Sequence, residues 1–224
     1  MAGIMSSPDP APPPLPLPEL SFGGYAGRPG QLEGVGFWPR AGARALDLLV
    51  HFIATYSAGF AFGIFIGIAA VLAHGTENAA PYVQAAVGKL QGATLLPFMA
   101  GLVGATVYEI VCEAGHGSTL GKMLLGMTVV REDGGFCGLK AATVRSLGYY
   151  VDALFFGVVG YYAMQGNMSQ QRHGDRWAKT VVCKRSSLRP DQVRSGVRFA
   201  AMFALAMIAD GAAFLMALTV ALIG

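Results

Sequence analysis

Four ionisable side chains near the start of the first apolar segment are spaced to share one face of a helix. Arg40, Arg44, Asp47 and His51 are separated by four, three and four residues, and side chains at these spacings are helical neighbours. Arg40 and Arg44 would lie near a membrane interface, within reach of lipid headgroups. In a membrane such groups face the protein interior and indicate an ion or proton path. A histidine near a carboxylate titrates near neutral pH. The alternative is a structural Arg44–Asp47 ion pair that locks the helix end.

A single carboxylate, Asp210, lies near the centre of the last apolar segment, with no basic residue close in sequence. A buried carboxylate must find a partner, bind a cation or be protonated. We expect Asp47, His51 and Asp210 to carry any cation- or proton-coupled chemistry. Glu109 and Asp152 are expected nearer an interface, with structural roles.

The glycine-rich stretch Gly117–Lys122 resembles a phosphate-binding loop only superficially. That loop needs Gly at position 116 and Ser or Thr at position 123, which here are His116 and Met123. We therefore expect Gly121 and Gly126 to serve packing and Lys122 to contact anionic headgroups. The sequence contains no nucleophile–base pair, metal-ligand triad or cofactor loop, so it predicts no enzyme, no metal and no cofactor. Cys112, Cys137 and Cys183 are expected to be free thiols.

The composition predicts the elements that must position these residues. The chain is 54% hydrophobic and 13% charged, whereas soluble domains carry about 25% charged residues. Four apolar blocks occur, at Ala45–Ala73, Gly92–Cys112, Leu147–Met164 and Val197–Ile223. All but the third reach the roughly 20 residues that a membrane-spanning helix needs. The partner is thus a lipid bilayer with anionic headgroups, and the basic residues flank membrane segments rather than bind nucleic acid.

The distribution of basic residues predicts that the third block enters and leaves on one side. With that arrangement, 15 of the 16 Lys and Arg residues lie on the side of the N-terminus and one, Lys89, lies opposite. A crossing third block would distribute them almost evenly, against the positive-inside rule. Gly157 and Gly160 are placed to form the turn of a re-entrant hairpin. The chain is therefore expected in the cell membrane, multi-pass, with a cytoplasmic N-terminus.

Two short β-branched runs, Thr128–Val130 and Thr180–Val182, are expected to pair as cytoplasmic strands. The predicted fold is an all-α integral membrane protein with about three spanning helices, a short or re-entrant third hydrophobic segment and this two-stranded element. Residues 1–36 are expected to form a disordered Pro/Gly-rich tail, 37–185 the membrane domain, and 186–224 a basic linker with the last spanning helix. Glycines at 59, 63 and 67 and alanines at 209, 213, 217 and 221 predict close helix packing, within one chain or in a homo-oligomer.

Three motifs together resemble those of the RDD family of small membrane domains, over roughly residues 35–185. They are Gly36–Arg40 followed by Asp47, the central stretch Gly117–Val130, and the closing stretch Gln171–Val182. Arg145 matches a frequent basic position of the family. The resemblance implies that Arg40, Asp47 and Asp175 are the naming residues, with Asp152 as the rival for the second aspartate. It also implies a membrane fold, and transport of ions or small ligands has been suggested for the family.

Two functions remain open from the sequence. The first is a component of cation- or proton-coupled transport of ions or small solutes, favoured by the glycine-broken third block. The alternative is a non-catalytic scaffold or accessory subunit that associates with other membrane subunits, favoured by the small size of the chain.

Overall fold

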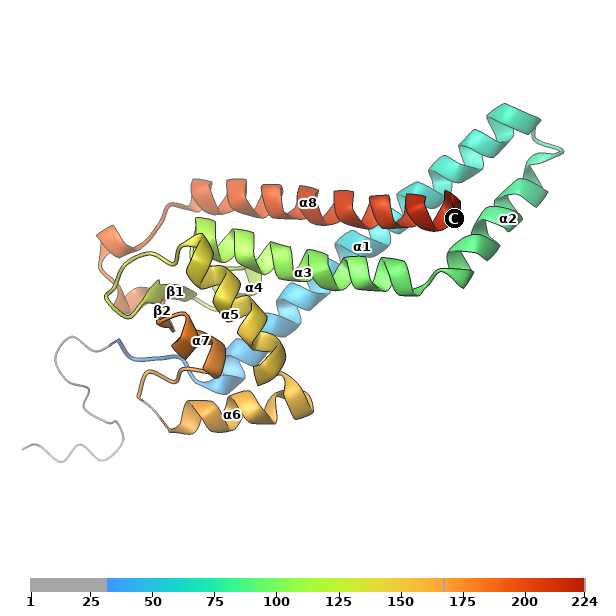
Figure 1. Ribbon diagram of the computed structural model, residues 1–224. Helices are drawn as coiled ribbons and strands as arrows, with labels where there is room; N and C mark the ends of the chain where they lie inside the picture. The colour runs from blue at the N-terminus through green and yellow to red at the C-terminus, as the bar shows by residue number, and fades with distance from the viewer. Residues whose placement is uncertain (1–31, 167, 224) are drawn as a thin grey trace, which may run out of the picture.

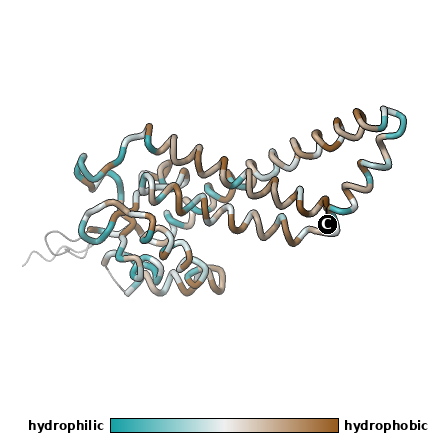
Figure 2. The backbone as a smooth tube through the Cα atoms, turned by 45° about the horizontal axis from the view of Figure 1, so that its top comes forward, coloured by the Kyte–Doolittle hydropathy of each residue, from teal (hydrophilic) through white to brown (hydrophobic). Residues whose placement is uncertain are grey.

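Three long apolar helices dominate the computed structural model, which describes residues 32–166 and 168–223. They are α1 (Phe37–His74), α3 (Leu95–Gly115) and α8 (Gly196–Ile223), and each is long and apolar enough to cross a membrane. With a single two-stranded sheet in the described residues, they confirm the predicted all-α membrane class. Figure 2 shows apolar residues along the helices and hydrophilic ones mainly at the two ends of the molecule.

The first helix is longer than predicted. It begins at Phe37, eight residues before the predicted apolar block, with Pro39 in its first turn. Proline is tolerated in a first helical turn because the N–H groups there have no helical partner. At 38 residues α1 is about 57 Å long. The connection after it is largely helical, as α2 (Ala79–Gly92).

The closest packing among the long helices joins α3 and α8, which run side by side while α1 crosses behind them (Figure 1). Ala217 and Ala221 of α8 are buried, so the predicted alanine face packs in part. On the glycine face of α1, a methyl group at Gly59 would lie 3.7 Å from Phe214 of α8, whereas one at Gly63 or Gly67 would meet no described atom within 4 Å. The prediction of close packing is therefore wrong for Gly63 and Gly67 within the described chain.

The short third apolar block folds back on itself. It comprises the end of α5 (Leu139–Asp152), a 3₁₀ turn η1 (Leu154–Gly157) and α6 (Val158–Gln165). The reversal uses left-handed backbone at Phe155, Phe156 and Gly157. Gly157 thus serves the turn as predicted, whereas Gly160 lies within α6 and lets it approach Asp152 closely. Figure 1 shows α6 running back toward the end of the molecule from which α5 comes.

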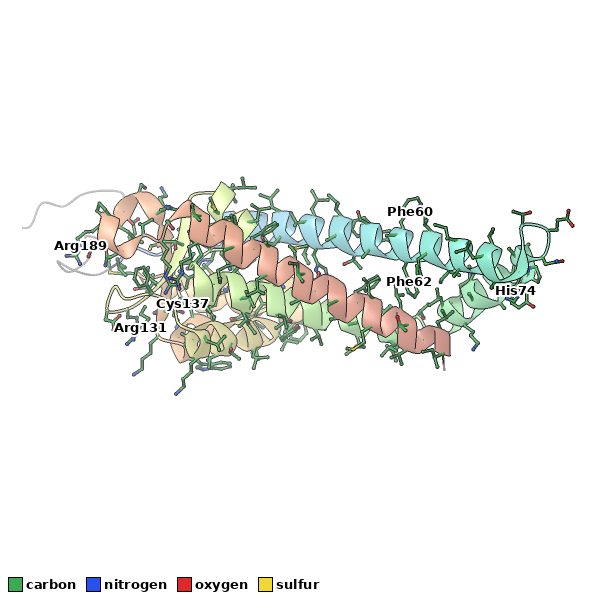
Figure 3. The ribbon with its side chains drawn as sticks, turned by 90° about the horizontal axis from the view of Figure 1, so that it is seen from above. Phe60, Phe62, His74, Arg131, Cys137 and Arg189 are labelled. Atoms are coloured by element: carbon green, nitrogen blue, oxygen red, sulfur yellow. The ribbon has the colours of Figure 1, made fainter. Side chains whose placement is uncertain are left out.

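The remaining elements gather at that same end. They are α4 (Leu120–Leu124), β1 (Met127–Arg131), α7 (His173–Trp177), β2 (Thr180–Lys184) and the 3₁₀ turns η2 (Arg185–Ser187) and η3 (Pro190–Gln192). The strands pair antiparallel, with Val129 opposite Val182, so both flanks of the third block lie together as predicted. Figure 3 places Arg131 and Arg189 at this end and His74 at the opposite end.

A small core holds this end together. It includes Met127, Val129, Cys137, Ala142 and Val182. Val35 joins it and donates its backbone N–H to the carbonyl oxygen of Val182 at 2.8 Å. The last residues of the predicted tail are therefore packed, while residues 1–31 of that prediction lie outside the described part of the chain.

Candidate functional site

Seven buried or partly buried side chains form a continuous chain of ion pairs at the sheet end of the molecule. Positive and negative groups alternate along it, in the order Arg40, Asp175, Arg145, Glu113, Lys122, Glu109 and Arg44. The members come from α1, α3, α4, α5 and α7. One electrostatic system therefore ties most of the helical elements to each other.

Asp175 joins the start of α1 to α5. Its Oδ2 accepts from Arg40 Nη1 at 2.5 Å, and its Oδ1 lies 3.1 Å from Arg145 Nη2. Arg40 also donates to the carbonyl oxygens of Val35 and Gln170, both at 2.8 Å. Because its side chain is 4% exposed, the expectation that Arg40 reaches lipid headgroups is wrong. Of the two rival aspartates, the structure places Asp175 against Arg40.

The acidic residues of α3 bind the central motif. Lys122 Nζ contacts Glu113 closely and lies 3.1 Å from Glu109 Oε1. Arg145 Nη1 approaches Glu113 from the other side, at 3.3 Å from Oε2. Lys122 is 5% exposed, so the expected contact with headgroups is wrong. Instead, the carboxylates of Glu109 and Glu113, one helical turn apart on α3, hold Lys122 inside the protein.

Arg44 completes the chain with a partner that differs from the predicted one. Its Nη1 lies 3.1 Å from Glu109 Oε2, so the predicted Arg44–Asp47 pair is wrong. The carboxylate of Asp47 instead accepts three hydrogen bonds, from Thr119 Oγ1 at 2.6 Å, the backbone N–H of Gly121 at 2.8 Å and Tyr108 Oη at 3.0 Å. Asp47 therefore fastens α1 to the start of α4.

The two glycines of the central motif have different roles. A methyl group at Gly121 would lie 2.1 Å from the carbonyl oxygen of Ala43, so this residue permits the close approach of α4 and α1, as predicted. Gly126 has a φ of +66° and open space around its Cα. It provides a left-handed turn before β1 rather than the expected packing contact.

Asp152 holds the start of α7. Its carboxylate accepts from the backbone N–H groups of His173, at 3.1 Å, and Gly174, at 3.2 Å. Its Oδ1 also lies 3.0 Å from His173 Nδ1. A carboxylate at a helix N-terminus satisfies N–H groups that lack a helical partner, so the geometry of Asp152 is that of a cap.

Two members of this system that lie outside the long helices, Asp175 and Arg145, have shifted pKa values. Burial acts to raise the pKa of Asp175, but Arg145, Arg40 and Arg172 outweigh it and hold the pKa well below its usual range. Burial acts to lower the pKa of Arg145, but Glu113 and Asp175 outweigh it and raise the pKa. Both side chains are therefore charged at neutral pH.

A second, separate pair lies near the middle of the long helices. His51 Nδ1 of α1 is 2.9 Å from Asp210 Oδ2 of α8, with 15% and 3% of the two side chains exposed. Asp210 is about 20 Å from either end of α8. Within residues 32–166 and 168–223, neither side chain forms an ion pair with any other residue. Two of the predicted residues thus meet, whereas Asp47 belongs to the other system.

Glycines of α3 make room for the His51–Asp210 pair. A methyl group at Gly104 would lie 1.7 Å from Asp210 Oδ1, and one at Gly101 would lie 3.7 Å from His51 Nε2. On its other side His51 lines an open, apolar cavity of about 850 Å³ between α1 and α3, with Phe52, Phe98 and Phe214. The pair is therefore enclosed by α3 on one side and faces an apolar space on the other.

Glu113 was not predicted as a site residue, and the ion-pair partners of Glu109 and Arg145 were not predicted either. The available signal was the spacing of the two glutamates, which lie four residues apart at the end of an apolar helix and so share a face. No grouping of three or more His, Cys, Asp or Glu side chains suited to a metal ion occurs in the described ranges.

Three apolar helices and a buried charge system at one end define a multi-pass membrane protein. The sequence matches the RDD family over residues 35–179, about two thirds of the chain. The chain belongs to the RDD family. No curated protein and no solved structure matches it.

Proposed function

We propose that this protein is a component of proton- or cation-coupled transport, and that the His51–Asp210 pair is its proton-binding centre. The observation that carries the proposal is the 2.9 Å approach of these two titratable side chains at mid-span. Ionisable groups at that depth are costly and mark ion or proton paths. Both side chains are groups that can bind and release a proton, which a proton-transport centre requires.

The separation of the pair from the ion-pair chain supports this assignment. Every member of the chain is matched to an opposite charge, and Asp47 is held by three donors. The residues of the ion-pair chain and Asp47 therefore have a structural role, because they hold the helices together. We therefore restrict the transport centre to His51 and Asp210 and leave Asp47 out of it.

The test is flux into sealed vesicles that contain the purified protein. Imposed pH, Na⁺ and K⁺ gradients should drive uptake or release by the wild-type protein. Asp210→Asn should abolish that flux while folded protein stays near wild-type amounts, because an amide resembles the neutral acid but does not titrate. The control is Asp191→Asn, an exposed aspartate, which should leave flux unchanged. Unchanged flux in Asp210→Asn would remove the pair from the mechanism.

A second candidate function is a membrane scaffold or accessory subunit. The ion-pair chain favours it, because seven linked side chains fix α1, α3, α4, α5 and α7 to each other at one end. Absence of flux in the wild-type protein under all three gradients would favour the scaffold. In either case we place the protein in the cell membrane with its N-terminus in the cytoplasm, since this orientation satisfies the positive-inside rule.

A further inference from the structure

A second cavity, distinct from the one beside His51, lies where the first turns of α1, the end of α5 and α6 come together (Figure 1). Its volume is about 350 Å³, within the range of small-ligand sites. Three arginines contribute to its wall, Arg40, Arg44 and Arg172. The remainder of the wall is largely apolar and includes Leu48, Phe156 and Met164.

The positive charge of this pocket is incompletely matched. Within residues 32–166 and 168–223, Arg172 Nε is buried without a hydrogen bond and lies 3.8 Å from Asp175, which already contacts Arg40 and Arg145. Arg44 pairs with Glu109 through Nη1, but its buried Nε has no hydrogen-bond partner among the described residues. The one carboxylate that lines the pocket, Asp152, accepts from His173 and Gly174. Each of these two guanidinium groups has five N–H donors, and the ion pairs with Glu109 and Asp175 use only part of them.

The two arginines are also held near each other. The guanidinium carbons of Arg44 and Arg172 lie 4.6 Å and 5.5 Å from the centre of the Tyr149 ring. Cation–π contacts fix such side chains in place. Planar guanidinium groups pair with phosphate through two hydrogen bonds each, so this arrangement suits a phosphate group.

The surroundings of the pocket correspond to a membrane interface. Trp38 packs against the lining residue Phe37, and Tyr162 packs against Tyr161, which also contacts Phe37. Trp38 and Tyr162 are 77% and 69% exposed, and exposed Trp and Tyr mark the level of lipid headgroups. Phe156 is fully exposed and follows Phe155 in left-handed backbone, which is costly for residues other than glycine. Strain of this kind is concentrated at ligand-binding and switching segments.

We propose that this pocket binds the phosphate head of an anionic amphiphile, with the phosphate against Arg44 and Arg172 and the apolar chain along Leu48 and Phe156. The shared chemistry is a phosphate ester, which a membrane phospholipid or a free phosphate compound could provide. The apolar wall and the interfacial aromatics favour the phospholipid. The site is independent of the proposed transport centre.

The test measures lipid binding to the full-length protein, delipidated in a non-ionic detergent, by native mass spectrometry. Phosphatidylglycerol should bind as one tight copy, at least tenfold more tightly than phosphatidylcholine. Arg172→Gln should lower the affinity for phosphatidylglycerol at least tenfold. Arg189→Gln removes an equal charge from an exposed site at the same end (Figure 3), and it should change this affinity less than twofold.

A second variant keeps the proposal testable if Arg172→Gln fails to fold. Ala45 lines the pocket and is exposed, so the larger side chain in Ala45→Phe should fill the pocket while every charge is kept. This variant should also lower the affinity for phosphatidylglycerol at least tenfold. Equal binding of the two lipids, or equal binding by Ala45→Phe and the wild-type protein, would overturn the proposal. Displacement of phosphatidylglycerol by millimolar inorganic phosphate would contradict the lipid assignment and identify a free-anion site.

Discussion

At the scale of single residues, the buried charged side chains form two separate systems with different roles. The chain from Arg40 to Arg44 consists of paired groups, and a buried ion pair is very sensitive to the loss of one partner. The His51–Asp210 pair contains one histidine, whose charge depends on pH. The first system should therefore respond to mutation through stability and the second through activity.

Asp175→Asn tests the structural role of the first system. The substitution leaves Arg40 and Arg145 buried without a carboxylate, which should lower the free energy of unfolding by about 3–5 kcal/mol. Asp191→Asn removes the exposed Arg189–Asp191 pair and should change the free energy of unfolding by less than about 1 kcal/mol. The measurement is chemical unfolding in detergent micelles. Equal stability of the two variants would contradict the structural role of Asp175.

At the scale of elements, local patterns were predictable and contacts between distant segments were not. Strand β1 follows from a local β-branched run. The return of the third block follows from its short length and from the distribution of basic residues along the whole chain. The helix α2 was missed because its hydropathy is low, although its alanines favour a helix.

The residues of the candidate site could be predicted from the sequence better than the contacts that they make. The face shared by Arg40, Arg44, Asp47 and His51 follows from helical periodicity. Their partners lie between 61 positions away, as with Tyr108 for Asp47, and 159 positions away, as with Asp210 for His51. Such pairings depend on how the helices pack, which no spacing within one helix specifies. The same limit explains why Asp210 had no visible partner in the sequence.

Substitution of Gly104 tests the packing of α3 against α8. A methyl group there would overlap Asp210 Oδ1, so Gly104→Ala should force the two helices apart or displace the carboxylate. We expect a loss of about 1–3 kcal/mol in the free energy of unfolding. Gly63→Ala has open space and should be neutral or slightly stabilising. Thermal unfolding of both variants in one detergent decides between these outcomes.

At the scale of the whole molecule, the three long helices separate a large polar end from a small one. The sheet, α4, α7 and both flanks of the α5–α6 hairpin lie at one end, and the α1–α2 connection lies at the other (Figure 1). Most basic residues belong to the larger end. The positive-inside rule then predicts that this end faces the cytoplasm.

Labelling of single introduced cysteines in intact cells tests this orientation. Cysteines at Asp133 and Ser186, on opposite sides of the hairpin in sequence and both exposed, should be protected from an impermeant external reagent. A cysteine at Asn78, exposed at the other end, should react. The wild-type chain controls for its own cysteines, which are all buried. External labelling at position 186 but not 133 would mean that the hairpin crosses the membrane.

We propose that the His51–Asp210 pair, whose side chains lie 2.9 Å apart, takes up and releases a proton within the membrane. Infrared difference spectroscopy of the protein in lipid bilayers, between alkaline and acidic pH, observes carboxyl and imidazole protonation directly. The wild-type protein should show a titrating change that disappears in Asp210→Asn and persists in Asp191→Asn. Identical difference spectra for the wild-type protein and Asp210→Asn would contradict the claim.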